Sequence, residues 1–429
     1  MSALCAGTIL GVTSGVAAAA DLPTTKGPPP PPPSWWSTLT ITGEIDAGIM
    51  GNPDNPGDGL NWGRLFDDKA NAPVLNASIL TISRPTDPNA TSYDVGFTVQ
   101  TTYGEDARFT HYLGEGEYWI NAPEQFDVLQ ANLQVHTPWL TSAGIDWKLG
   151  EWSTLEGAET IDPAGNLFYS HSYIFNYPEP FKDFGVLAIT HVNPTVDVYT
   201  AVTSGQQTTL VPYVGDNNDA PAFEGGIGLN KLFGGSVTVL ATTHIGPENG
   251  AGSPNAPGGV NNAANTALVY ENDLVVTWNA TDKITVTGEG NYTRNDLSND
   301  ETYGAVGYIS YQTPWDWLKI NGRAEVFRDD TGGYVSEYPG NFDYVLAEHG
   351  FGNTAIFQGP ATYAEFTAGV NITPTIPASV PFIKGVIFRP EVRYDTTLDG
   401  STPFNIPANG AVGTKSDMVT VGGDVIVKF

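Results

Sequence analysis

Basic residues, cysteine and long apolar runs are all scarce in this chain of 429 residues. Lys and Arg total 18 against 47 Asp and Glu, which gives a formal net charge of −29. Phosphate binding needs clustered Lys and Arg, so this balance excludes a nucleic-acid-binding protein. Charged residues make up only 15% of the chain and aromatic residues 11%, which is not typical of a disordered acidic chain.

Signatures of catalysis and metal binding are also missing. The sequence contains no Gly-x-Ser-x-Gly, His-Glu-x-x-His or phosphate-loop motif. Its six histidines have no metal-ligand spacing, and no acidic loop has the spacing of a calcium loop. Glu156 and Glu159 could serve glycoside hydrolysis, but no other feature supports that reading. We therefore expect no enzyme, no metal site and no cofactor, apart from divalent cations that bridge acidic surface loops to lipopolysaccharide phosphates.

The N-terminal region resembles a secretory signal followed by a spacer. The only cysteine, Cys5, lies in an apolar stretch, residues 3–20, that ends in small residues and lacks a positively charged start. We expect residues 1–20 to be a signal-peptide-like segment, the alternative being an unremarkable apolar N-terminus. Residues 21–36 contain six consecutive prolines and are predicted to form an extended periplasmic spacer.

Beyond residue 37 the chain shows period-two alternation of apolar and polar residues. Leu39 to Met50 is the first clear example, with Ile41, Ile45 and Ile49 on one face and Glu44 and Asp46 among the residues on the other. Such alternation predicts strands with one polar side. About sixteen segments of this kind follow one another, and no later segment has the ~18 consecutive apolar residues of a transmembrane helix.

The connections between these segments alternate between short and long. Short turns on one side, long loops on the other and an even strand count are the layout of a bacterial outer-membrane barrel. The polar faces are too polar for the dry core of a soluble sandwich, and a water-filled lumen explains them. Residues 37–429 are therefore predicted to form an all-β transmembrane antiparallel barrel of about sixteen strands, with short periplasmic turns and long extracellular loops. The expected long connections are 51–73, 104–127, 152–183, 205–221, 246–267, 294–302, 329–361 and 396–416.

The third long connection, 152–183, is acidic and rich in aromatic residues. Loops of this length are uncommon in compact folds unless they are functional. We expect it to fold into the lumen as a constriction loop. At the other end of the chain, Phe429 closes an alternating strand and resembles the outer-membrane signal read by the barrel assembly machinery.

The segment Gly150–Gly185 resembles a known family. It carries Glu159, the run Asn166–Ser170, the run Ser172–Phe175 and a proline-rich turn. These features are similar to the putative beta-barrel porin-2 (OmpL-like) family, and the resemblance extends over most of the chain after residue 20. The resemblance implies an outer-membrane porin in contact with outer-membrane lipids. Related sequences often have a His before the glycine that opens the next strand, where this chain has Asp183-Phe184-Gly185, so no role of that His is transferred.

Charged residues predicted to face the lumen suggest how a pore could discriminate between solutes. Opposed charges across a narrow aqueous gap create a transverse field that penalises apolar solutes. The alternative is that the same residues form wall salt bridges that only satisfy lumen side chains. The expected acids are on the loop and the bases on the wall: Glu156, Glu159 and Asp162 against Lys148, Arg323, Arg389 and Arg393.

The aromatic residues of the loop have two readings as well. They are either a sugar-stacking track or, as we expect, anchors that hold the loop against its entropy cost. These residues are Phe168, Tyr169, Tyr173, Phe175 and Tyr177. The predicted function is passive diffusion of small hydrophilic solutes and ions with a weak cation preference, and by analogy the porin is a homotrimer. The alternatives are a non-conducting surface barrel that acts as anchor or adhesin, and a secreted glycan binder.

Overall fold

The computed structural model describes residues 34–87, 89–112, 122–209, 216–250, 262–348, 350–352, 354–408 and 410–429. The chain divides into two units, 1–39 and 40–429. In the first unit the described residues form a 3-10 turn, η1 (Trp35–Thr38). The predicted signal segment 1–20 and the proline run of the spacer lie outside the described residues.

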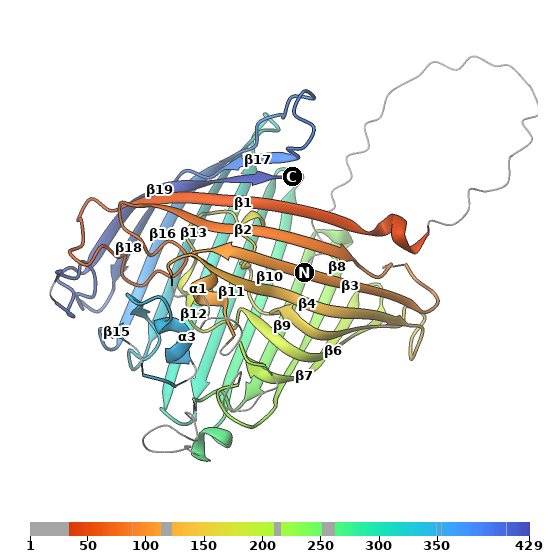
Figure 1. Cartoon of the computed structure of the whole chain (residues 1–429), viewed down its shortest axis with the longest axis horizontal. Coiled ribbons are helices and arrows are strands. Elements are labelled where there is room, and N and C mark those ends of the chain that lie inside the picture. Colours follow the sequence, from red (N-terminus) through yellow and green to blue (C-terminus); the bar gives the residue numbers. More distant parts are fainter. Residues whose placement is uncertain are drawn as a thin grey trace, which may run out of the picture. The chain divides into compact units, whose positions relative to one another are not determined.

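The second unit is a closed antiparallel barrel of sixteen strands (Figure 1), which confirms the predicted fold class. Each strand pairs with its sequence neighbour, and β1 closes the ring by pairing with both β2 and β19. The strands are β1 (Thr40–Gly51), β2 (Pro73–Arg84), β3 (Asp94–Gly104), β4 (Gln125–Thr137), β5 (Ile145–Ser153), β6 (Lys182–Asn193), β7 (Val196–Gln206), β8 (Ala222–Leu232), β9 (Val237–Gly246), β10 (Val269–Thr281), β11 (Ile284–Asn295), β12 (Asp300–Gln312), β13 (Leu318–Asp329), β16 (Ala361–Ile372), the pair β17 (Gly385–Phe388) and β18 (Glu391–Thr397), and β19 (Asp417–Lys428).

The fifteenth barrel strand is interrupted between β17 and β18, although its sequence alternates throughout. Both halves pair with β16 and β19, so they are one strand of the barrel wall. The interruption falls at Arg389–Pro390, where proline has no N–H to donate to the ladder. The Pro390 carbonyl still accepts from Val370 N at 3.1 Å, and Arg389 N donates to the Asp424 carbonyl at 3.1 Å.

Side chains alternate between the two faces of the wall as the sequence pattern predicts. On β13, Ile320 and Val326 are exposed on the outer face, while Asn321, Arg323 and Glu325 are buried on the inner face. β18 repeats this arrangement along its length. One apolar face and one polar face along each strand fit a barrel with lipid outside and polar groups inside.

The connections fall into the expected two groups, with one correction. The predicted long connection 294–302 is a four-residue hairpin, 296–299, because β11 and β12 continue their ladder out to the pair Asn295–Asp300. Packing of Tyr292 on Tyr303, with ring centroids 5.2 Å apart, supports this extension.

Short elements decorate the long connections. They are α1 (Ala107–Thr110), η2 (Pro163–Gly165), α2 (Tyr173–Asn176), η4 (Asn262–Asn265), α3 (Asp343–Glu348) and the small sheet β14 (Ser336–Glu337) with β15 (Ile356–Phe357); η3 (Phe233–Gly235) lies in a short turn. Among the described residues, no helix is long and apolar enough to cross a membrane.

The main hydrophobic cluster lies among the loops and not between two layers of secondary structure. It joins loop residues such as Trp62, Phe109 and Tyr344 to aromatics of the connection between β5 and β6 and to inner-face residues of the wall such as Tyr363. The sequence pattern did not predict this packing, because the cluster joins residues of loops that are far apart in the sequence.

Candidate functional site

The connection between β5 and β6, residues 154–181, folds into the lumen. Its base is closed by a hydrogen bond from Thr154 N to the Phe181 carbonyl at 3.1 Å. Within it, Asp162 caps η2 by accepting from Ala164 N, and Ser172 caps α2 by accepting from Phe175 N. Short polar residues favour such positions because their side chains satisfy the free N–H groups of a helix start. We call residues 154–181 the inserted loop.

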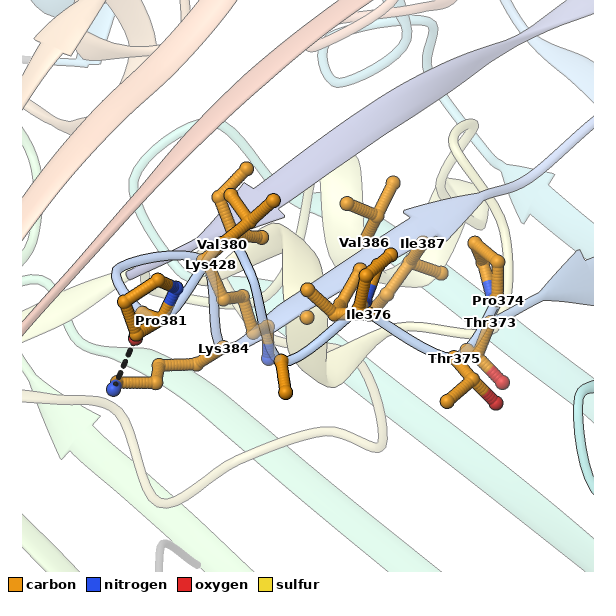
Figure 2. Close-up of a pocket in the computed structure, with 14 residues that line it drawn as sticks. Thr373, Pro374, Thr375, Ile376, Val380, Pro381, Lys384, Val386, Ile387 and Lys428 are labelled. Carbon is orange, nitrogen blue, oxygen red and sulfur yellow. Dashed lines mark hydrogen bonds between the residues drawn. The ribbon is translucent and has the colours of Figure 1, made fainter.

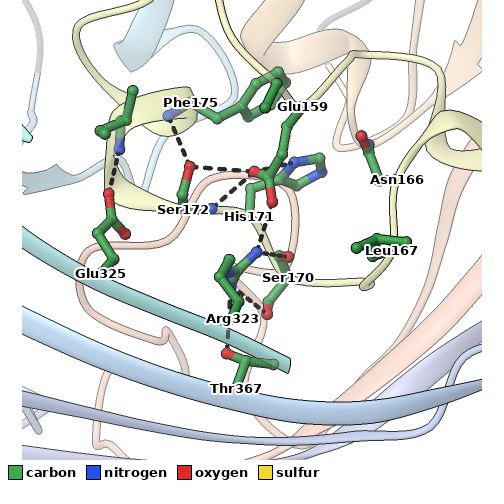
Figure 3. Close-up of polar contacts among 12 residues, drawn as sticks. Glu159, Asn166, Leu167, Ser170, His171, Ser172, Phe175, Arg323, Glu325 and Thr367 are labelled. Atoms are coloured by element: carbon green, nitrogen blue, oxygen red, sulfur yellow. Dashed lines mark hydrogen bonds and ion pairs between the residues drawn. The ribbon is translucent and has the colours of Figure 1, made fainter. Parts of the chain in front are cut away.

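Arg323 of β13 holds the middle of the inserted loop. Its guanidinium pairs with Glu159 at 2.7 Å and with Glu365 of β16 at 2.6 Å, and it donates to the Ser170 carbonyl at 2.7 Å. Figure 3 shows Glu159 lying between Arg323 and the donors His171 and Ser172. Burial would raise the pKa of Glu159, but the Arg323 charge and these hydrogen bonds lower it to about 2, so Glu159 is ionised at neutral pH.

Two further arginines of the wall bind backbone carbonyls of the inserted loop. Arg389 donates to the Pro163 carbonyl at 2.6 Å and the Asn166 carbonyl at 3.0 Å, while it pairs with Asp424 of β19. Arg393 donates to the His171 carbonyl and pairs with Asp395 at 2.7 Å. The three arginines therefore satisfy carbonyl groups of an irregular segment, which would be costly to bury unpaired.

Carboxylates of the wall satisfy the N–H groups of the same segment. Glu391 accepts from Tyr169 N at 2.8 Å and from Ser170 N at 3.3 Å. Glu325 accepts from Tyr173 N at 2.7 Å and from Ile174 N at 2.9 Å. Strand alternation places Glu325 and Glu391 on the lumen face, but sequence reasoning did not identify them as partners of the loop.

The five aromatic residues predicted as anchors are all buried. Tyr169 packs on Gly48 of β1 and donates to Asn76 of β2 at 3.0 Å. Tyr173 donates to Asp395 at 3.0 Å and stacks on Tyr363 with ring centroids 5.0 Å apart.

The remaining three aromatics of this set contact the wall or neighbouring loops. Phe168 lies under the Arg323 guanidinium, 5.3 Å from ring centroid to Cζ. Phe175 stacks on His171, with ring centroids 4.3 Å apart, and Tyr177 donates to the Ser336 carbonyl at 2.8 Å. Phe168, Tyr169, Tyr173 and Phe175 line neither of the two described pockets, whereas Tyr177 lines the polar one.

The charged residues predicted to oppose one another across water are arranged differently. Arg323 and Glu159 are in direct contact, and Arg389 and Arg393 are buried against the loop backbone, so no aqueous gap separates them. Asp162 caps η2 and accepts from Gln100 at 3.4 Å, and among the described residues it forms no ion pair with Arg389, which binds the neighbouring Pro163 carbonyl.

Lys148 and Glu156 have no arginine among the charged groups that act on them most strongly. The charges that act on Lys148 of β5 are those of Glu224 and Asp146 on the barrel wall. Glu156 lies among carboxylates instead, with Glu271 and Asp273 of β10 as its strongest neighbours. Strand alternation determines whether a side chain points to the lumen or to the lipid, but not which residues of the loop or of other strands it contacts.

An acidic part of the wall, formed by β8, β10 and β11, faces the residues Glu156 and Glu179 of the inserted loop. Its buried carboxylates are Glu224, Glu271, Asp273 and Glu289, joined by Glu156 and Glu179 from the loop. Sequence reasoning missed Glu179, Asp273 and Glu289, whose only signal was a lumen-facing position or a place in the loop. In the described part of the chain these three bring carboxylate oxygens within 4.8 Å of one another.

The last residue of the chain pairs with the first strand of the barrel. Phe429 exchanges backbone hydrogen bonds with Gly43, at 3.0 and 2.9 Å, and its ring covers that glycine; its role in assembly stays a prediction.

A surface pocket of about 550 Å³ lies at the turn between β16 and β17 (Figure 2), beside Lys384 and Lys428. Its lining is mostly apolar, and no residue of the inserted loop contributes to it.

Comparisons with known proteins agree with this architecture. The family model described as "Putative beta-barrel porin-2, OmpL-like" matches residues 38–429. The outer membrane channel DcaP of Acinetobacter baumannii has 12% identity and a TM-score of 0.50, over 91% of this chain and 97% of that chain. An anion-selective porin from Comamonas acidovorans has 9% identity and a TM-score of 0.51, over 91% of this chain and 99% of that chain. No curated protein matches the sequence.

The fold and the loop inside it define a porin-type barrel of the bacterial outer membrane. The chain belongs to the beta-barrel porin-2, OmpL-like family, because the match covers nearly all of it. In such a barrel the end with the chain termini and short turns is periplasmic, and the long connections are extracellular. The solved structures support the fold alone at these identities.

Proposed function

We propose that this porin allows passive diffusion of small hydrophilic solutes and ions, that the inserted loop narrows its lumen, and that it prefers cations weakly. The observation that carries the proposal is the inserted loop itself. Tyr169 of the loop contacts inner-face residues of β1 and β2, and the Ser170 carbonyl accepts from Arg323 of β13. Gly157 and Ala158 of the loop donate to carboxylates of β10 and β11. A segment held at several parts of the ring reduces the free cross-section.

The charge of the lumen supports the cation preference. Each arginine that holds the loop is neutralised by a carboxylate of the wall: Arg323 by Glu365, Arg389 by Asp424 and Arg393 by Asp395. The acidic wall formed by β8, β10 and β11 has no comparable arginine set among the described residues. An acidic path concentrates cations and repels anions.

A polar pocket marks where such a path opens toward the long loops. It is lined by Gln206, Glu248 and Glu271 together with Asp300 and Tyr338. This pocket lies on the acidic part of the barrel, and none of Arg323, Arg389 and Arg393 lines it. We propose that solutes pass along the acidic wall, and that the arginine side fixes the loop. The five buried aromatics then act as anchors of that loop.

A non-conducting barrel that serves as anchor or adhesin is the second candidate. It is favoured by the hydrophobic cluster that joins several long loops to the inserted loop, because such packing could close the mouth. The third alternative, a secreted glycan binder, has no support from the outer-membrane family.

Reconstitution into a planar lipid bilayer separates the two candidates. Stepwise current increments with a reversal potential that favours K⁺ over Cl⁻ are expected for the pore. Small sugars and amino acids added in turn should reduce the current if they enter the lumen. A folded barrel that inserts without any conductance step would identify the non-conducting form, and a reversal potential that favours Cl⁻ would refute the cation preference.

The arginine side offers a matched test of the constriction. Arg389→Ala with Arg393→Ala removes the donors to the Pro163, Asn166 and His171 carbonyls. The expected result is a larger unit conductance, because the loop loses its hold on that wall. Unchanged conductance and selectivity in a folded double variant would exclude Arg389 and Arg393 as the residues that hold the loop in its constricting position.

A further inference from the structure

Three buried carboxylates converge where the inserted loop meets the barrel wall. Glu179 comes from the loop after α2, Asp273 from β10 and Glu289 from β11, and their exposed fractions are 2%, 4% and 6%. One oxygen from each lies within 4.8 Å of the others. The charges that act on Glu179 are those of Glu289, Asp273 and Glu156, which are all acidic. Unpaired carboxylates this deep repel one another strongly.

A fourth carboxylate, independent of this triad, points to a ligand at the same place. Glu156 is 1% exposed, and neither of its carboxylate oxygens has a hydrogen-bond partner in the described structure. Its strongest charged neighbours are Glu271 and Asp273. A buried charged group without a hydrogen bond is rare because the lost hydration is not replaced. A bound cation would replace that hydration for all four carboxylates.

The backbone brings these groups together through a glycine. Gly157 has a φ of +80°, and a Cβ at this position would lie 2.1 Å from a Glu179 carboxylate oxygen. Gly157 N donates to Asp273 Oδ1 at 3.4 Å and Ala158 N donates to Glu289 Oε2 at 3.3 Å. These contacts orient Asp273 and Glu289, and the second oxygen of Asp273 accepts from Asn291 Nδ2 at 3.4 Å, whereas neither carboxylate oxygen of Glu179 has a hydrogen-bond partner in the described structure. Only glycine tolerates both the conformation and the close approach.

We propose that Glu179, Asp273 and Glu289, with Glu156 beside them, bind a divalent cation of the Ca²⁺ type at the junction of loop and wall. The donors are oxygens only, with no histidine or cysteine in the set, which favours a hard cation over zinc or copper. Irregular spacing and donors from separate segments suit the flexible shell of Ca²⁺ better than the strict octahedron of Mg²⁺.

The proposed ion would join the loop to the wall. Two donors belong to the inserted loop and two to the hairpin β10–β11, so binding the ion fixes the loop to a part of the wall that carries none of the three loop-binding arginines. Ion binding does not require the chain to conduct, so it can be tested apart from the proposed function.

The direct test uses the full chain, folded in detergent free of lipopolysaccharide and stripped with EGTA. Calcium chloride titrated in a calorimeter should show one saturable site, with a weaker response to magnesium chloride. Glu179→Gln combined with Asp273→Asn should lower the Ca²⁺ affinity about tenfold or more, since affinity follows the number of charged ligands. Asp282→Asn is the matched control, because Asp282 is exposed at the far end of the same hairpin. No saturable site in the wild type, or equal affinity in the double variant, would overturn the proposal.

Thermal unfolding gives a second readout that holds even where the variant is destabilised. Ca²⁺ should raise the Tm of the wild type and of Asp282→Asn but not that of the double variant. In EGTA the double variant should be as stable as the wild type or more so, because the repulsion between carboxylates is removed. A Tm increase of equal size in all three proteins would place the ion at surface acids and refute the site.

Discussion

Replacing Arg323 tests whether the inserted loop is held by charge or only by packing. Arg323→Met keeps an apolar stem of similar length but removes the ion pairs to Glu159 at 2.7 Å and Glu365 at 2.6 Å. It also removes the hydrogen bond to the Ser170 carbonyl at 2.7 Å. Both carboxylates would then be buried without this partner, although Arg393 still lies 3.6 Å from Glu365.

The expected energetic cost of Arg323→Met follows from the burial of Glu159 and Glu365. Leaving a buried charge without its partner costs about 3–5 kcal/mol. Exposed fractions of 6% for Glu159 and 0% for Glu365 mean that water does not relieve the cost in place. The loop can regain hydration for Glu159 only by leaving the wall. We therefore expect the loop to detach locally, and the unit conductance of the barrel to increase.

A double-mutant cycle isolates the pair. Glu159→Gln alone should cost less than Arg323→Met, because the amide still accepts hydrogen bonds and no charge is left unpaired. The double variant should recover part of the loss, with a coupling of about 2 kcal/mol between the two sites in guanidinium unfolding. Single-channel recording of the four proteins reports the position of the loop independently of stability.

The control is Arg294→Met, which removes a solvent-exposed arginine of β11 paired with Asp296 and Glu301. It should leave conductance and unfolding close to those of the wild type. If Arg323→Met folds, conducts as the wild type does and shows no coupling to Glu159→Gln, then Arg323 does not hold the inserted loop.

Three further predictions follow from other parts of the barrel. Glu271→Gln removes a carboxylate from the polar pocket and should lower the K⁺ over Cl⁻ preference, read from the reversal potential in a salt gradient; an unchanged preference would remove Glu271 from the path. Burial, with Asp58 nearby, raises the pKa of Glu337 in β14 to about 9, so its contribution to stability is greatest below about pH 4.5 and declines toward pH 9, by at most ~1.4 kcal/mol per pH unit. Glu337→Gln should flatten thermal stability over that window, and an unaltered pH profile would contradict the assignment. Gly48→Val places a Cβ 2.7 Å from the Tyr169 ring and should cost ~1–3 kcal/mol and loosen the inserted loop, whereas Gly48→Ala should do so less; equal unfolding curves for both variants and wild type would exclude this contact.

The barrel wall of this protein was predictable from the sequence. Alternation along segments such as Leu318 to Arg328 predicted both the strands and their lumen faces, because a strand has a side-chain period of two and lipid accepts only one of the two faces. The even strand count and the two classes of connection came from the same pattern. Its failure at 294–302 has a local cause, since polar residues there continue the ladder up to Asn295 and Asp300.

The contacts of the lumen residues were not predictable from the sequence, because they depend on the path of the inserted loop. The position of Arg323 on the inner face was predictable, but its partner Glu159 lies 164 residues earlier in the chain. Whether two lumen residues face one another across water or touch depends on the path of the loop between them. That path is fixed by long-range contacts, such as Tyr169 to Asn76 and Glu391 to the loop amides, for which a local sequence pattern has no periodicity. The convergence of Glu179, Asp273 and Glu289 has the same origin, because barrel closure and loop insertion together bring one loop residue to two neighbouring strands.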